Sequence, residues 1–139
     1  MADIKALINV AGFSLKAGRV TMKPVTQADA GAYCKAFDVD VMRYMYPDPF
    51  RSTEDAAALL GSFEEQRRAG CTLMCVIMDD IDGMIGDVEA YDLDTNAPEI
   101  GVWIAKDHWH QGIAFDALSA FIAFLKSNGA YDHFVYTAA

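Results

Sequence analysis

The chain has 139 residues, of which 53% are hydrophobic, so it is long enough for a domain with a buried core. Its formal net charge of −9 comes from 20 acidic and 11 basic residues, and the basic residues form no cluster. Such a surface repels phosphate backbones, which argues against nucleic-acid binding. No linker or repeat divides the sequence, and we therefore expect a single domain over residues 1–139.

Residues 1–20 contain only a short apolar stretch, interrupted by polar residues and glycine. The stretch is neither a convincing signal peptide nor long enough to cross a bilayer, so we expect a cytoplasmic protein without a membrane partner. The three cysteines, Cys34, Cys71 and Cys75, are an odd number without paired spacing, which argues against a disulfide framework. We expect Cys71 and Cys75 to be packing residues on one strand face.

The first half of the chain predicts a strand and two helices. Residues 19–23 alternate polar and apolar and stop at a proline, as a strand does. Residues 26–37 predict a helix with a capped start, and residues 41–45 predict a helical turn on the surface or beside a cleft. Residues 52–68 predict a second helix, with Gly70 just beyond its end.

The second half begins with a predicted hairpin. Residues 71–78 are apolar at successive positions, which is typical of a central strand covered on both faces. An Asp-Gly turn joins them to a second strand at residues 84–91. One face of this second strand is apolar, and the other carries Asp87, Glu89 and Tyr91.

A strand at residues 99–105, a helix at residues 113–126 and a strand at residues 134–137 complete the prediction. The last two strands are expected to be parallel, joined by a right-handed crossover through the helix. The expected fold class is therefore α/β of the α+β type, with a mixed, mostly antiparallel central sheet flanked by helices.

The segment before the last helix is the strongest candidate for a binding site. A helix that begins near Ile113 exposes backbone N–H groups and the positive end of its dipole, and this arrangement binds anions. Gly112 has no Cβ, so a phosphate can approach the chain closely. The residues alone leave an ordinary loop open as the alternative, because many helices start after a glycine without binding a ligand.

Metal sites are not expected. The acidic turns at residues 80–83 and 92–96 fail the pattern of a calcium loop. His108 and His110 lack a third ligand at a convincing spacing, so we interpret them as loop histidines.

Residues 99–118 resemble the acetyl-CoA-binding signature of the GNAT superfamily of N-acetyltransferases. They are most similar to the branch of ribosomal-protein N-terminal acetyltransferases, in which a Glu-Ile-Gly-x-Trp strand leads to Trp-Gly-x-Gly-x-Ala. Residues 22–30, 41–44 and 85–86 resemble further family segments in the same order, so the resemblance covers about residues 20–137. It implies a GNAT-like acyl-CoA N-acyltransferase fold and direct transfer of the acetyl group of acetyl-CoA to a primary amine.

By position, the resemblance implies that the loop holds the CoA pyrophosphate and that the preceding strand pairs with the pantetheine arm. The implied cofactor-binding residues are Ile100, Gly101, Val102, Trp103 and Ile104 in the strand, and His110, Gln111, Gly112, Ile113 and Ala114 in the loop and helix start. His110 stands where the branch usually has glycine. The family normally continues beyond the last predicted strand with a helix and two strands, so we expect a C-terminally short member or a sheet completed by another chain.

The implied reaction needs a base, because only a neutral amine attacks the thioester. Glu99 is the first candidate, since it starts the strand that leads to the loop, and a surface carboxylate at a strand end is the alternative. Glu89 and Tyr91 are secondary candidates. The expected acceptor is a small-molecule amine or a protein N-terminus. The alternative function is that of a non-catalytic or degenerate remnant of the fold that binds CoA or dimerises.

The last predicted strand also suggests an oligomer. Phe134 to Thr137 would form a sheet edge that carries apolar side chains. Exposed edges pair with other chains, so we expect a homodimer whose interface includes these residues.

Overall fold

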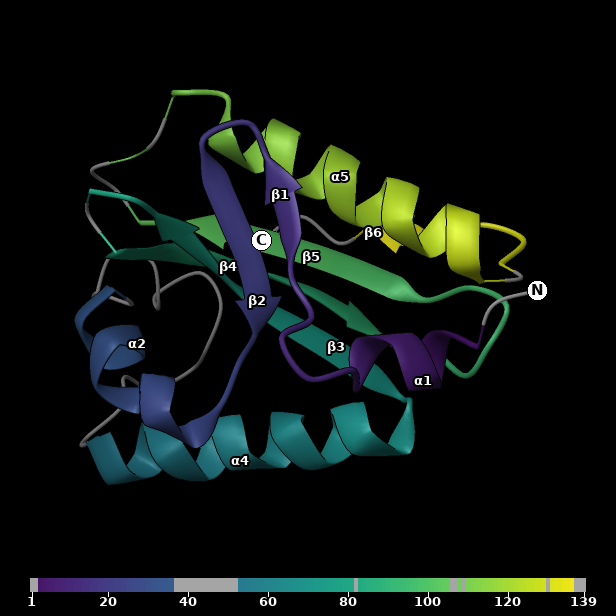
Figure 1. The fold of residues 1–139 in the computed structure, drawn as a ribbon, viewed down its shortest axis with the longest axis horizontal. Coiled ribbons are helices and arrows are strands. Elements are labelled where there is room, and N and C mark those ends of the chain that lie inside the picture. The colour runs from purple at the N-terminus through teal and green to yellow at the C-terminus, as the bar shows by residue number, and fades with distance from the viewer. Residues whose placement is uncertain are drawn as a thin grey trace.

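The computed structural model describes residues 3–36, 53–81, 83–105, 108, 110–129 and 131–136. The helical turn predicted at residues 41–45 lies outside them. Within the described chain, six strands form one sheet in the order β1-β2-β3-β4-β5-β6 (Figure 1). Neighbouring strands are antiparallel except for β5 and β6, which are parallel. The mixed, mostly antiparallel sheet flanked by helices confirms the predicted fold class.

The strands are β1 (Leu15–Ala17), β2 (Val20–Pro24), β3 (Thr72–Asp79), β4 (Gly83–Tyr91), β5 (Glu99–Ile104) and β6 (Val135–Tyr136). The α-helices are α1 (Ile4–Ile8), α2 (Ala30–Ala36), α4 (Thr53–Ala69) and α5 (Ile113–Asn128), and a 3-10 turn, η1 (Gln27–Asp29), precedes α2.

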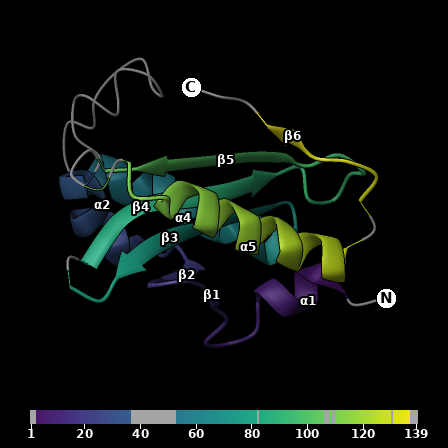
Figure 2. The same cartoon turned by 90° about the horizontal axis from the view of Figure 1, so that it is seen from above.

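Helices cover both faces of the sheet (Figures 1 and 2). The core beneath α5 includes Val88 and Phe121, both with no exposed surface. The core beneath α2 and α4 includes Tyr33, Leu60 and Val76, which are also fully buried. Strand β3 contributes side chains to both cores, which confirms the prediction of a central strand covered on both sides.

The structure confirms the predicted start of the helical segment at Thr26 and the predicted start of α5. The Thr26 backbone N–H donates to Asp29 Oδ2 (2.9 Å) and caps the turn that leads into α2. Helix α5 begins at Ile113 as predicted, and the Gly129 N–H donates to the Leu125 carbonyl at its end (2.8 Å). The helix therefore runs two residues further than the predicted end at residue 126.

Other boundaries differ from the prediction. Helix α1 and strand β1 were not predicted, because a five-residue helix and a three-residue strand are too short for a periodic pattern. Strand β3 begins at Thr72, so Cys71 precedes the strand, and only Cys75 is a buried packing residue. Phe134 lies outside β6 and packs beside Tyr131 (5.7 Å between ring centroids).

None of the helices in the described part of the chain is long and apolar enough to span a bilayer. The expectation of a cytoplasmic location remains a prediction.

Candidate active site

A cleft lies at the end of β5, beside the last described residue of β6. Within the described residues, the parallel pairing of β5 and β6 joins Glu99 with Val135 and Ile100 with Tyr136. The cleft has a volume of about 320 Å³ and lies between the end of β5, the following loop, the start of α5 and Tyr136 of β6. The predicted cofactor residues that line it are Val102, Trp103, Ile104, His110, Gln111, Gly112, Ile113 and Ala114. Ile100 and Gly101 lie earlier on β5 and do not line it.

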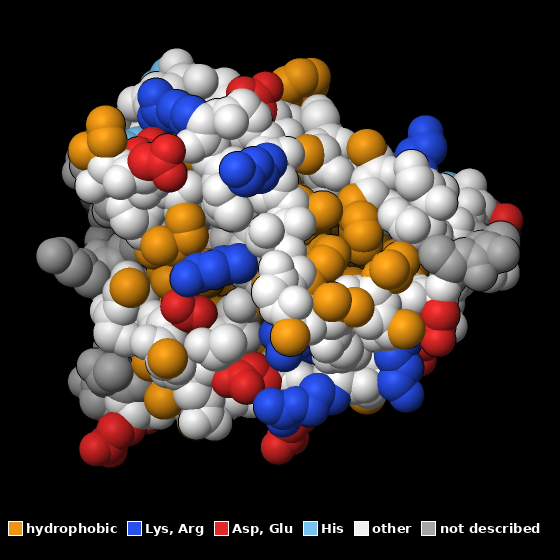
Figure 3. All heavy atoms as spheres, in the orientation of Figure 1, with side chains coloured by type: hydrophobic (Ala, Val, Ile, Leu, Met, Phe, Trp, Pro, Cys, Tyr) orange, Lys and Arg blue, Asp and Glu red, His pale blue; other side chains and the backbone are white. Residues whose placement is uncertain are grey.

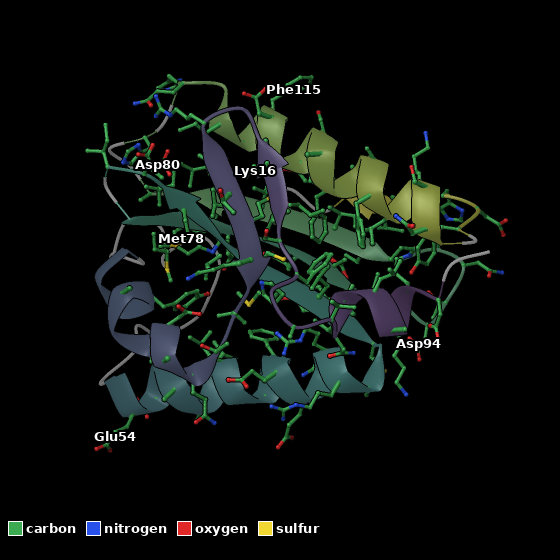
Figure 4. The ribbon with its side chains drawn as sticks, in the orientation of Figure 1. Lys16, Glu54, Met78, Asp80, Asp94 and Phe115 are labelled. Carbon is green, nitrogen blue, oxygen red and sulfur yellow. The ribbon has the colours of Figure 1, made fainter. Side chains whose placement is uncertain are left out.

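The loop before α5 has a backbone suited to a close approach. His110 and Gly112 both adopt positive φ, at 63° and 75°. Gly112 is the N-cap of α5, and its would-be Cβ meets no atom within 4 Å. The N-terminal N–H groups of α5 therefore face an open side of the cleft. Phe115 also lines the cleft, at the start of α5 with 75% of its surface exposed (Figure 4).

Arg19, in the turn between β1 and β2, contacts this loop through Gln111. Its guanidinium Nη2 donates to Gln111 Oε1, and its Nε lies 3.3 Å from Asp79 Oδ2 at the end of β3. The Arg19 side chain is 56% exposed, so it presents a cation beside the cleft. Sequence reasoning missed Arg19, because the contact joins residues 92 positions apart and neither residue marks it locally.

The predicted acid–base candidates lie together on the sheet face beneath α2 and α4. On β4 and β5, Tyr91 is opposite Glu99 and Glu89 is opposite Gly101. None of the three candidates lines the cleft, but Glu89 is the closest to it along the strands. Its Oε1 lies so near Gly101 that a Cβ at that position would collide with it. Because Gly101 has no side chain, the carboxyl group of Glu89 can lie against β5 at this position.

Glu89 is only 6% exposed, and this burial raises the pKa of its carboxyl group. A hydrogen bond with Asp87 lowers the pKa of Glu89, and the negative charge of Glu99 raises it. A carboxyl group with a raised pKa is suited to exchanging protons near neutral pH.

Asp87 is a second buried carboxyl group on this face and is not among the predicted site residues. It has no exposed surface, and burial together with the charge of Glu89 raises its pKa well above the ordinary value of 3.8. Tyr33 Oη donates to Asp87 Oδ2 (3.1 Å), and Trp103 also forms a hydrogen bond with Asp87. The two rings meet edge to face, 5.9 Å between centroids. Strand alternation placed Asp87 beside Glu89, but only the structure shows that helices bury the pair.

A larger hollow, of about 590 Å³, lies between α1 and α4, where Figure 3 shows basic side chains. Its lining includes Lys5, Asn9, Arg67 and Arg68, and none of the predicted site residues. Asn9 donates to the Arg67 carbonyl (2.9 Å), and Arg67 Nε donates to Asn9 Oδ1 (3.3 Å). These bonds tie α1 to α4, so we assign the hollow a structural role.

No group of three histidine, cysteine, aspartate or glutamate residues within the described ranges is arranged to hold a metal ion.

The fold is that of an acetyltransferase of the GNAT type. A family model described as an acetyltransferase (GNAT) domain matches residues 19–139, and the chain belongs to this family. No curated protein matches the chain.

Solved structures of acetyltransferases share the fold. RimL, a ribosomal L7/L12 alpha-N-protein acetyltransferase solved with coenzyme A, superimposes with a TM-score of 0.80 at 16% identity, over 89% of this chain and 73% of RimL. The Salmonella typhimurium acetyl transferase that modifies the N-terminal serine of L7/L12 gives 0.73 at 17% identity, over 85% and 70%. The microcin C7 self-immunity acetyltransferase MccE, solved with acetyl-CoA and AMP, gives 0.73 at 15% identity, over 85% and 68%. Rim-type enzymes are thus among the structures that this chain resembles, in line with the branch expected from its sequence.

Proposed function

We propose that the protein transfers the acetyl group of acetyl-CoA to a primary amine. The observation that carries this proposal is the cleft between β5 and β6, into which the N-terminus of α5 opens beside Gly112. A pyrophosphate at this position would accept hydrogen bonds from the N–H groups of residues 111–114. The pantetheine arm would run along β5 from Ile104 towards Gly101, beyond the last pair with β6 in the described residues.

The chemistry is a direct attack of the amine nitrogen on the thioester carbonyl. The C–N bond forms, the C–S bond breaks, and the sulfur leaves as a thiolate that takes up a proton. A carboxylate on the face shared by Glu89, Glu99 and Tyr91 accepts the proton of the incoming ammonium, because only the neutral amine is a nucleophile. Backbone N–H groups of β5 polarise the thioester carbonyl.

The acceptor that we propose is the α-amine of a protein N-terminus. The net charge of −9 attracts cationic groups. RimL and the Salmonella typhimurium enzyme, which share the fold, act on a ribosomal protein N-terminus. A small-molecule amine is the second candidate acceptor.

The test is thiol release from acetyl-CoA in the presence of peptides with free N-termini, the same peptides with blocked N-termini, and small amines. We expect release with free N-termini only. Thiol release with small amines but not with peptides would show that the acceptor is a small-molecule amine and not a protein N-terminus. Calorimetric binding of acetyl-CoA without release for any amine would favour the non-catalytic alternative.

Arg19→Ala is expected to weaken CoA binding about tenfold, because it removes one charge-assisted contact beside the phosphate position and releases Gln111. The matched control is Lys16→Ala, which removes the same charge from an exposed position on β1 (Figure 4). Calorimetry should give a weaker Kd for the Arg19 variant alone, and equal affinities would remove Arg19 from the site.

Glu99→Gln separates two roles of Glu99. If Glu99 is the base, the acetylation rate falls most at low pH while CoA affinity is preserved. If Glu99 only raises the pKa of Glu89, its removal lowers that pKa, and activity extends to lower pH than in the wild type. The pH profile of kcat/KM distinguishes the roles, and a profile identical to the wild type would exclude both.

We propose that the chain forms a homodimer through β6. This is the terminal strand of the described sheet, and Val135 and Tyr136 on it are 43% and 56% exposed (Figure 2). An apolar sheet edge pairs readily with a second copy. Light scattering at tens of micromolar should give the dimer mass. A monodisperse monomer would contradict this assembly.

A further inference from the structure

Asp87 and Glu89 form a buried pair of carboxyl groups on β4, and the proposed reaction assigns no role to Asp87. Within the part of the chain that the structure describes, the charged and titratable groups that face the pair are Tyr33 of α2, Glu99 of β5 and Tyr91 of the same strand. Among the described residues, the rest of the cluster on this face is apolar or aromatic: Met74 and Val76 lie opposite the pair on β3, and Leu60 and Phe63 of α4 and Trp103 of β5 belong to the same cluster. The pair therefore has a low-dielectric surrounding.

Two oxygens of the pair are buried and have no donor in the described part of the chain. They are Asp87 Oδ1 and Glu89 Oε2. Two ionised carboxylates can only accept hydrogen bonds, so they repel each other and leave these oxygens unsatisfied. Asp87 and Glu89 are two residues apart on one face of β4, so a single proton held between their carboxyl groups gives both of these oxygens a partner.

The proton belongs on Asp87 for a geometric reason. Asp87 is the deeper of the two, with no exposed surface, whereas Glu89 retains 6% and lies over Gly101 at the edge of the proposed thioester position. The negative charge is less costly on the residue that is closer to solvent and to the substrate.

We propose that Asp87 and Glu89 share one proton at neutral pH, and that Asp87 donates it to orient Glu89, whose carboxylate is the general base. This proposal rests on the proposed acetyl transfer. Glu89 takes one proton from the substrate ammonium and passes it to water. The amine nitrogen loses its second proton after attacking the thioester carbonyl, and that proton ends on the CoA thiol. Asp87 touches no reacting atom and is a positioning residue.

The proton on the pair is tested without any substrate, by infrared spectroscopy of the intact protein. At neutral pH we expect the C=O stretch of a protonated carboxylic acid. We expect it to disappear in Asp87→Asn and to shift in frequency in Glu89→Gln, where Asp87 stays buried but loses its carboxylate acceptor. The matched control is Glu99→Gln, on the same face, which should retain the band. A wild-type spectrum without the band at neutral pH, a band that survives Asp87→Asn, or a band at an unchanged frequency in Glu89→Gln would overturn the shared proton.

The role of Glu89 is tested by kinetics with the amine that the thiol-release assay identifies. Glu89→Gln should lower kcat roughly 100-fold or more, the contribution of a general base, with CoA affinity unchanged. Asp87→Asn should shift the acidic limb of the kcat profile, which a merely structural residue would not move. A wild-type kcat for Glu89→Gln overturns the base assignment. If no amine is acetylated, the proposed function fails and the infrared result still decides the proton sharing.

Discussion

Gly112→Val is expected to weaken CoA binding about 10- to 100-fold, the loss of one to two charge-assisted hydrogen bonds. Gly112 adopts φ of 75° at the N-cap of α5, and the space where its Cβ would lie is open. A valine there meets no protein atom but occupies the approach of the phosphate. It also pulls the loop away from positive φ, a conformation that a β-branched residue rarely adopts.

The control for this variant is Gly12→Val. Gly12 has nearly the same φ, 79°, and equally open space, but it lies in the turn between α1 and β1, away from the cleft. Both variants should therefore lose similar stability to backbone strain, and only Gly112→Val should lose affinity for CoA in calorimetry. Equal affinities in the two folded variants would exclude the N-terminus of α5 as the phosphate site.

Asp87→Asn is expected to make the protein more stable than the wild type, by an amount that grows with pH. The pKa of Asp87 is raised in the folded state, so the folded protein holds a proton that the unfolded chain releases above about 3.8. The wild-type free energy of unfolding then falls by about 1.4 kcal/mol per pH unit, from the unfolded pKa up to the raised folded pKa. Asparagine keeps a hydrogen-bond donor there and does not titrate, so this loss is absent.

Urea unfolding of both proteins at several pH values measures the effect. The control Asp80→Asn removes the same charge from the exposed turn between β3 and β4 (Figure 4). A difference between Asp87→Asn and the wild type that stays constant with pH would show that Asp87 is ionised in the folded protein. A stabilising substitution at a buried carboxyl group is expected where the group serves function at the expense of stability.

The hairpin and the helix-start loop were predictable because their signals are local. The apolar run of β3 and the Asp-Gly signal after it predicted the hairpin. The alternation along β4 correctly predicted which of its side chains share a face. The start of α5 at Ile113 followed from Gly112 and the apolar positions beyond it. Period and turn chemistry are read from neighbouring residues, so they need no tertiary information.

The buried state of Asp87 was not predictable in the same way. Alternation of polar and apolar residues usually indicates one solvated face, yet α2 and α4 cover the polar face of β4 here. Whether a carboxyl group on a strand is solvated or buried depends on which helices pack there, and this is set by contacts distant in sequence. The same holds for Arg19, which reaches Gln111 only because the turn between β1 and β2 lies beside the start of α5.

The central claim, that CoA binds at the N-terminus of α5, is tested most directly by titrating CoA into the ¹⁵N-labelled protein and following each backbone amide by NMR. We predict that the largest shifts fall on the amides of residues 111–114, with further shifts along β5 from Gly101 to Ile104. Shifts concentrated instead around Asn9 and Arg67, in the hollow between α1 and α4, would contradict the account, as would unchanged spectra at saturating CoA.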